Sequence, residues 1–376
     1  MPATLQAFRL CRTCSERQGA GSSAFEVIGG AGCFVCAGLM NRTTKVAKIA
    51  CRRARRYQFR TFSVGITVPE GVQEREDELR SEMRLKGNET IKTQAARLVA
   101  NIVSEELGKR IDRERPEVAL LADYGACDVL VTSKPIFYYG RYSKPVGIAQ
   151  RRSFCEKCRG AGCEKCRNTG FDRKPNVEDS LRKKLSEFSG SQKMTFTWLG
   201  SEDRESRVFP PGRPFVVEVK NPRKRTLPRR FAARLRQGQV SVSSGRVLPS
   251  KPLRLPAFRF MTKIRAVAAT KPTPGALSEL RTAFRRAPVR FERPHNRPTV
   301  KTVYRVSAKA RGRKLLIDAE LDGGLPVKRF VNGDLVSPSV SEVLKTEVSC
   351  RSFDIFRVRE MGEFSFAEIT RGEEKN

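Results

Sequence analysis

The chain of 376 residues is long enough for two or three domains, and its 39% hydrophobic content is enough to form packed cores. It carries 74 Lys and Arg against 40 Asp and Glu, which gives a net charge of +34. This excess predicts a polyanionic partner, most simply a nucleic acid. No apolar run has transmembrane length and none resembles a secretory signal, so we expect a soluble, cytoplasmic protein.

The only histidine, His295, lies in a stretch rich in Pro, Arg and Asn that predicts a solvated loop. Acid–base catalysis by a pair of histidines is therefore excluded. For the same reason, a zinc site in this chain would need ligands that are essentially all cysteine.

Eight of the eleven cysteines form four Cys-x-x-Cys pairs: Cys11 and Cys14, Cys33 and Cys36, Cys155 and Cys158, Cys163 and Cys166. In an intracellular basic protein this spacing predicts structural zinc held by four thiolates before it predicts disulfides. How the pairs share metal stays open, because a pair near residue 160 and an N-terminal pair can also combine. The alternatives are reduced cysteines in a small core and a thiol-redox protein.

The N-terminal half continues with a basic stretch at 42–60, a strand at 62–68 and two helices within 70–112, separated at Gly87-Asn88. The second helix carries apolar residues at three- and four-residue spacing, which indicates a core face. Strands are predicted at 118–124 and 127–132. The aromatic and basic stretch 134–144 is typical of an RNA surface and nominates Arg141 and Lys144, although an aromatic strand packed on a helix is an alternative.

A polar loop with three carboxylates follows the strand at 194–199 and precedes an apolar strand at 214–220. The central carboxylate is Asp203. On residue physics alone, an aspartate in a Gly-Ser-Glu-Asp turn is more often a turn or cap residue than a nucleophile. RNA contacts are predicted for Arg207 in this loop, for Lys220 at the end of the second strand, and for Arg223, Lys224 and Arg225 in the basic run that follows.

The remaining chain alternates strand-like segments with a helix near 274–286, strands at 302–308 and 314–321, and a short helix and strands near the C-terminus. This pattern predicts a mostly antiparallel α+β domain. We expect an RNA-binding accessory domain over 1–150, a cysteine-rich junction over 151–175 and a catalytic domain over 176–376.

Several motifs resemble the archaeal and eukaryotic tRNA pseudouridine synthases that have an N-terminal THUMP-containing domain. GSEDRESRV followed by GRPFVVEV is similar to the family's G-R-E-D-x-D-x-R and G-R-P-F pattern, with departures at Ser201 and Glu205. KTVYRVSAKA resembles the motif with the active-site tyrosine, and GGLPVKRFVNGD resembles G-T-Y-I-K-E-F-V-x-G-D. In the last motif the family's second, uracil-contacting tyrosine falls on Pro326.

The resemblance implies a zinc-binding, THUMP-like α/β accessory domain and a mixed, mostly antiparallel pseudouridine synthase domain. It implies Asp203 as the nucleophile, Tyr304 as the active-site tyrosine and Lys328 as the basic partner of the aspartate. The implied reaction needs no catalytic cofactor: a flipped-out uridine at position 54 or 55 of the TΨC arm of tRNA becomes pseudouridine. We expect a monomer, and the alternative function is a non-catalytic, zinc-containing RNA-binding protein.

Overall fold

The computed structural model describes residues 8–19, 25–85, 88–293 and 297–366, so His295 lies outside the described residues. The chain divides into two compact units. Unit 1 contains Met1–Pro135 and Lys220–Arg225, and unit 2 contains Ile136–Val219 and Thr226–Asn376. The division after Pro135 differs from the one expected at 150, because Ile136–Lys144 hydrogen-bonds into the sheet of unit 2.

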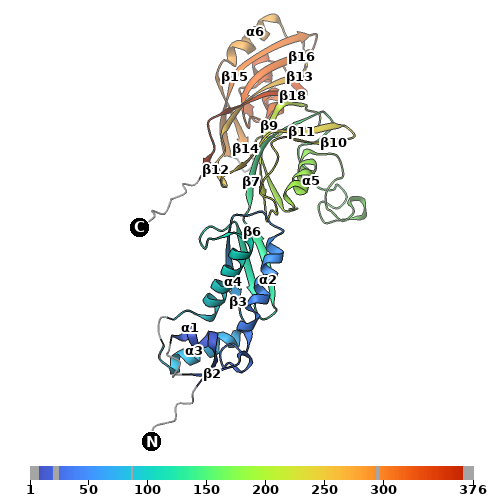
Figure 1. Cartoon of the computed structure of the whole chain (residues 1–376). Coiled ribbons are helices and arrows are strands. Elements are labelled where there is room, and N and C mark those ends of the chain that lie inside the picture. The colour runs from blue at the N-terminus through green and yellow to red at the C-terminus, as the bar shows by residue number, and fades with distance from the viewer. Residues whose placement is uncertain (1–7, 20–24, 86–87, 294–296, 367–376) are drawn as a thin grey trace. The chain divides into compact units, whose positions relative to one another are not determined.

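Unit 1 has a four-stranded sheet in the order β4-β3-β5-β6, in which only the β5–β6 pair is antiparallel. Helices α2 and α4 pack on each other and against this sheet (Figure 1). The strands are β1 (Arg9–Cys11), β2 (Glu26–Ile28), β3 (Thr61–Thr67), β4 (Arg110–Ile111), β5 (Val118–Asp123) and β6 (Asp128–Ser133). The helices are α1 (Arg12–Gln18), η1 (Gly30–Gly32), η2 (Leu39–Arg42), α2 (Thr43–Ala54), α3 (Glu70–Glu82) and α4 (Ile91–Leu107).

Helix α4 shows how the sequence pattern produces this core. Its buried side chains, which include Ile91, Ala95, Val99 and Val103, recur every four residues and face one side. The Thr90 side chain accepts a hydrogen bond from the Thr93 backbone N–H at its start. The helix ends at a glycine in the left-handed region, where only a residue without Cβ is unstrained. The predicted helix and its two flanking strands are therefore present.

Unit 2 is built on an 11-stranded sheet in the order β10-β11-β7-β9-β18-β13-β16-β15-β14-β17, with β8 also paired to β9. All pairs are antiparallel except β9–β18, which confirms the mostly antiparallel prediction. The strands of unit 2 are β7 (Ile136–Lys144), β8 (Met194–Trp198), β9 (Val208–Val219), β10 (Phe231–Leu235), β11 (Gly238–Leu248), β12 (Pro252–Arg254), β13 (Ala257–Ala268), β14 (Ala287–Arg293), β15 (Arg297–Arg311), β16 (Lys314–Asp322), β17 (Val336–Ser337), β18 (Val348–Met361) and β19 (Ser365–Phe366). The helices are η3 (Glu164–Cys166), α5 (Val177–Ser189), α6 (Pro274–Ala283), α7 (Val327–Asn332) and α8 (Val340–Leu344).

Three hydrophobic clusters lie along this sheet, and two of them are large. One contains Leu280 and Phe284 around α6 and Phe330 and Val331 of α7, packed on strands β13 to β16 and β18. The other packs α5 against β7 and β9. Between them, at the centre of the sheet, the chain leaves β8 and enters β9 through the loop at 199–207. No helix in the described part of the chain combines the length and apolar character that a membrane span requires.

Candidate active site and metal centres

The loop between β8 and β9 carries Asp203, and buried polar groups hold this loop by its backbone. The ammonium of Lys144, on β7, donates to the carbonyl of Asp203 at 3.0 Å and to that of Ser206 at 2.5 Å. Burial lowers the pKa of Lys144 to about 8, although Glu202 and Asp203 oppose this shift. The loop also closes on itself, because Ser206 N–H donates to the Asp203 carbonyl at 3.1 Å.

Glu202 points into the protein beneath the same loop, and its side chain has no exposed surface. Tyr142 donates its hydroxyl to Glu202 Oε1 at 2.6 Å, and Gln150 donates to Oε2 at 3.1 Å. The Arg213 guanidinium lies 3.3 Å from Oε2 and donates to the carbonyls of Leu199 and Ser201. Because a buried carboxylate is stable only when it is paired and hydrogen-bonded, this network fixes the loop from below.

Asp203 faces the other way and is 41% exposed at its side chain. The ammonium of Lys328 lies 2.8 Å from Asp203 Oδ2, and this hydrogen bond raises the pKa of Lys328. Lys328 is on α7, which starts at the N-cap residue Pro326. Proline suits a helix start, because it lacks the N–H that would be unpaired there. The structure thus brings Asp203 and Lys328 together, as the family resemblance implied.

Tyr304 lies on β15, at a register shift between Val303 and Arg305. Its hydroxyl donates to Asp322 Oδ1 on β16 at 2.9 Å. The Arg259 guanidinium stacks on one face of the ring, 3.4 Å from the centroid. These contacts, rather than contacts with Asp203 or Lys328, orient the tyrosine.

Strands β13 and β18 supply polar side chains to both regions. On β13, Arg259 and Arg265 lie on the same face, because side chains alternate along a strand. Arg259 stacks on Tyr304, and Arg265 pairs with Asp354 of β18 at 2.7 Å. Asp354 in turn accepts a hydrogen bond from the backbone N–H of Arg207, where the Asp203 loop enters β9. Strand β13 thus supplies one arginine to the tyrosine and another, six residues away, to the aspartate that contacts the end of the Asp203 loop.

The predicted RNA-binding residues fall into two groups. Arg141 and Lys144 are buried on β7, where Arg141 donates to the Val358 carbonyl and lies 3.4 Å from Glu360. Their positions do not fit the prediction of a direct phosphate contact, because their charges are used inside unit 2. Arg225 is largely covered and donates to Ser133 and to the Lys134 carbonyl. The exposed members are Arg207 in unit 2 and Lys220, Arg223 and Lys224 in unit 1.

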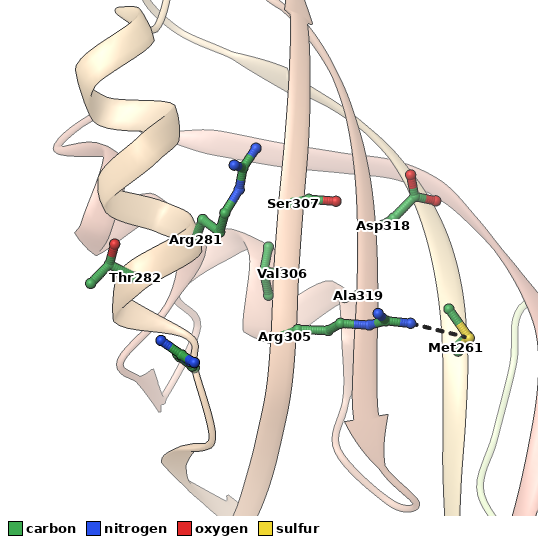
Figure 2. Close-up of a pocket in the computed structure, with 9 residues that line it drawn as sticks. Met261, Arg281, Thr282, Arg305, Val306, Ser307, Asp318 and Ala319 are labelled. Carbon is green, nitrogen blue, oxygen red and sulfur yellow. Dashed lines mark hydrogen bonds between the residues drawn. The ribbon is translucent and has the colours of Figure 1, made fainter.

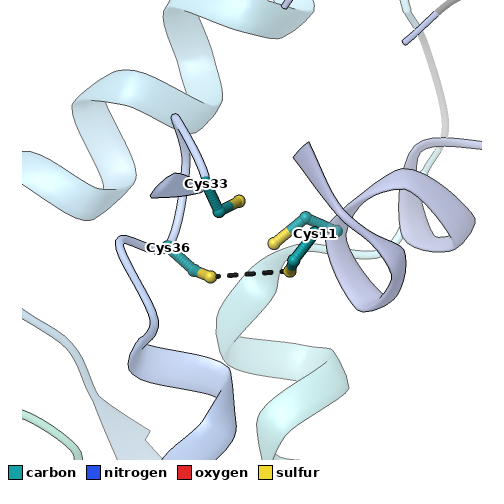
Figure 3. Close-up of side chains that lie close together, drawn as sticks. Cys11, Cys33 and Cys36 are labelled. Carbon is teal, nitrogen blue, oxygen red and sulfur yellow. Dashed lines mark hydrogen bonds between the residues drawn. The ribbon is translucent and has the colours of Figure 1, made fainter. Parts of the chain in front are cut away.

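The first cysteine cluster, Cys11, Cys14, Cys33 and Cys36, lies in the core of unit 1. Cys11, Cys33 and Cys36 point toward a common centre (Figure 3). The Sγ atoms of Cys11 and Cys36 are 3.7 Å apart. Four sulfurs bound tetrahedrally at about 2.3 Å are separated by about 3.8 Å, so this geometry fits a metal ion. The buried guanidinium of Arg17 donates to Cys14 Sγ at 3.4 Å and offsets the negative charge of a thiolate.

The second cluster, Cys155, Cys158, Cys163 and Cys166, forms inside one short loop of unit 2. Its Sγ–Sγ distances of 3.7 to 3.8 Å fit the same tetrahedral arrangement. Burial raises the pKa of Cys166, but N–H groups of Cys163 and Gly170 outweigh it and lower that pKa to about 6. Each set of four cysteines thus comes together within its own unit, which answers how the pairs combine.

Sequence reasoning missed Gln150 and Arg213 and gave Glu202 no separate role. The available signal was positional: Arg213 directly precedes the largely apolar residues 214–219 of β9, where an unpaired cation is costly to bury. Such a residue indicates a hidden carboxylate partner, and the nearest acidic loop contains Glu202. Of the three cysteines outside the Cys-x-x-Cys pairs, Cys51 and Cys350 are buried and Cys127 is partly exposed.

Known proteins resemble this chain over most of its length. A model for the archaeal Pus10 THUMP domain matches residues 46–123, and a model for the Pus10 C-terminal region matches residues 137–273. A tRNA pseudouridine synthase Pus10 from Nitrosopumilus maritimus is 30% identical over 334 residues, covering 87% of this chain and 85% of the relative. The one from Cenarchaeum symbiosum is 32% identical, covering 86% and 80%.

Among solved structures, a chain of a Cbf5-Nop10-Gar1 complex has a TM-score of 0.33 at 9% identity, covering 59% of this chain and 48% of that chain. A score this low establishes no shared fold. The sequence matches to the Pus10 relatives carry the assignment instead, because they extend through both units. The chain belongs to the Pus10 family of tRNA pseudouridine synthases and is an isomerase.

Proposed function

We propose that this enzyme converts uridine 54, uridine 55 or both in the TΨC arm of tRNA to pseudouridine, with Asp203 as the nucleophile. The observation that carries the proposal is the ion pair between Asp203 and Lys328, on a loop whose backbone is fixed by buried groups. The lysine cation lies against the carboxylate oxygen, and the carboxylate is the group that attacks in this proposal.

In the proposed reaction, Asp203 attacks the flipped-out uridine at the sugar C1′ or the base C6 and stores the intermediate covalently. The N1–C1′ bond breaks, the uracil rejoins C1′ through C5, and the bond to Asp203 breaks and returns the carboxylate. C5 loses a proton and N1 takes one up, so the product is an isomer of the substrate. Tyr304 stacks on the base and helps to move that proton. Arg259 covers one face of the tyrosine ring, so in this proposal the base stacks on the opposite face.

The net charge of +34 supports a role for backbone phosphates in offsetting the cost of extruding the uridine, a few kcal/mol. In unit 1, Lys220, Arg223 and Lys224 are the exposed residues that we propose bind tRNA, and Arg207 does so in unit 2. We further propose that the enzyme works as a cytoplasmic monomer.

We also propose that each cysteine cluster holds one structural zinc ion. Residues Cys11, Cys14, Cys33 and Cys36 would hold one, and Cys155, Cys158, Cys163 and Cys166 the other. The sulfur spacing described above supports this assignment, and zinc supplies cross-links here rather than chemistry. Metal analysis of purified protein should find about two zinc ions per chain, and none bound would contradict the proposal.

The enzymatic proposal is tested with pure protein and an unmodified tRNA transcript, by mapping which uridines become pseudouridine. Wild-type protein should modify position 54, 55 or both, and Asp203→Asn should modify neither while still binding tRNA. Full product with Asp203→Asn would contradict the assignment of the nucleophile. Tight, salt-sensitive binding without product from wild type would favour the non-catalytic RNA-binding alternative.

A further inference from the structure

A concave surface on unit 2 lies beside Tyr304 and is not used by the chemistry above. It encloses about 570 Å³ and is lined by residues of β13, β15 and β16 and by residues of and just after α6. Figure 2 shows Arg281 projecting from α6 toward β15, and Arg305 lying across β16 toward Met261. We call this surface the arginine pocket. Its lining includes Arg281, Arg285, Arg305, Ser307 and Asp318.

The arginine pocket has more positive charge than its own residues neutralise. Arg305 pairs with Glu320 at 3.2 Å. Arg281 and Arg285 are exposed, and within the described ranges neither guanidinium has an ion-pair or hydrogen-bond partner. The single carboxylate in the lining, Asp318, lies 4.0 Å from Lys263. Two arginines therefore remain available for an anion from outside.

The position of the pocket relative to Tyr304 follows from the strand register. Asp318, Glu320 and Asp322 alternate along β16 and so share one face of the sheet. Asp322 accepts the Tyr304 hydroxyl, and Glu320 lies between Arg259, at 3.7 Å, and Arg305. The pocket thus begins one side-chain step beyond the contacts that hold the tyrosine.

We propose that the arginine pocket binds backbone phosphates of the RNA strand next to the target nucleotide. This inference rests on the proposed function, because it assumes that Tyr304 marks the place of the extruded base. Arginine guanidinium groups form paired hydrogen bonds with phosphate oxygens, and the Ser307 hydroxyl adds a further donor. Two guanidinium groups without a carboxylate partner suit the phosphates of an RNA strand, because contacts to the backbone do not require a particular base.

The first test compares Arg281→Ala/Arg285→Ala with Arg311→Ala/Arg313→Ala, which removes the same charge from the exposed β15–β16 hairpin. Binding of a TΨC-arm RNA hairpin is measured over a range of salt concentrations. The pocket variant should bind about tenfold more weakly at low salt, with a log–log salt slope smaller by about one to two. The hairpin variant should lose much less. Equal losses in the two variants, or none, would overturn the proposal.

The second test identifies the phosphates. Single neutral methylphosphonates are placed along the strand that carries the target uridine. One or two adjacent positions should weaken binding to wild type about tenfold and have no further effect on the pocket variant, as expected for a direct contact. Additive losses at every position would overturn the proposal. Product formed at saturating RNA is scored separately: wild type without product defeats the proposed chemistry, whereas the binding results decide the pocket on their own.

Discussion

The two regions that carry the proposed catalytic side chains are fixed in opposite ways. Asp203 lies on a loop held from beneath by Glu202, Lys144 and Arg213, which are all buried. Tyr304 lies on a strand and is held from the side by Asp322 and Arg259 on the sheet surface. Because of this difference, we expect changes beneath the aspartate loop to alter both the stability of unit 2 and catalysis, and changes at the tyrosine contacts to alter catalysis alone.

The largest effect is expected when the nucleophile itself is changed. Asp203→Asn should lower kcat by about a thousandfold or more, because the amide cannot attack. The half-exposed pair with Lys328 contributes little stability, so unfolding free energy should change by less than about 1 kcal/mol. Single-turnover assays and urea denaturation measure the two quantities. A large loss of stability would show that Asp203, like Glu202, helps to hold the loop in place.

The neighbouring carboxylate should behave in the reverse way. Glu202→Gln leaves the buried Arg213 without its ion partner and should reduce the unfolding free energy by about 3 kcal/mol. Glu205→Gln is the matched control, because Glu205 is in the same loop but exposed, and should change it by less than about 0.5 kcal/mol. Urea denaturation of both variants provides the comparison. If Glu202→Gln and Glu205→Gln were equally stable, the buried network would not hold the Asp203 loop, and the loop would not differ from the tyrosine region in this respect.

Some of the residues behind these expectations could be identified from the sequence, and others could not. Asp203, Tyr304 and Lys328 were nominated by motif resemblance. The fold places Lys328 beside Asp203. Helix α4 and strands β3, β5 and β6 were predictable, because their apolar periods match helix and strand geometry. These signals are local, so a single sequence contains them.

The support of the loop could not be predicted in the same way. Tyr142 and Glu202 are 60 residues apart and meet only because β7 lies beside β9. Arg141 and Lys144 looked like surface cations, since buried cations are rare. They are interior because β7 is covered on both faces, and their partners lie on β18 and in the Asp203 loop. The sequence of the strand contains no signal for those partners.

A smaller effect is expected at the tyrosine. Asp322→Asn removes the charged acceptor of the Tyr304 hydroxyl and should lower kcat about ten- to hundredfold, with RNA affinity unchanged. The double variant Tyr304→Phe/Asp322→Asn should be no slower than Tyr304→Phe, because both changes remove the same hydrogen bond between Tyr304 and Asp322. Steady-state kinetics and RNA binding test this. Additive losses would mean that Asp322 acts independently of the tyrosine.

The smallest effect is a pH dependence of stability at the aspartate loop. The pKa of Lys144 is lowered to about 8 in the folded protein and has its ordinary value of 10.5 when unfolded. The unfolded chain therefore binds more protons between these values, and wild-type stability should rise with pH across that window. Relative to Lys144→Met, the gain from pH 8 to 9.5 should be about 1 to 2 kcal/mol. If the stability of wild type and of Lys144→Met changed equally with pH, the lowered pKa of Lys144 would be excluded as the cause.

The short segment Lys220–Arg225 belongs to unit 1 although the chain has already formed part of unit 2. Its Arg223 carbonyl and Arg225 N–H pair with Gln58, and Asn221 accepts from the Ser133 N–H. During synthesis the N-terminal unit must therefore wait for residues 136–219 to leave the ribosome before its last contacts can form. Folding of unit 1 therefore finishes only after most of the first part of unit 2 has been synthesised. A fragment that stops at Pro135 lacks Lys220–Arg225 and cannot form these contacts.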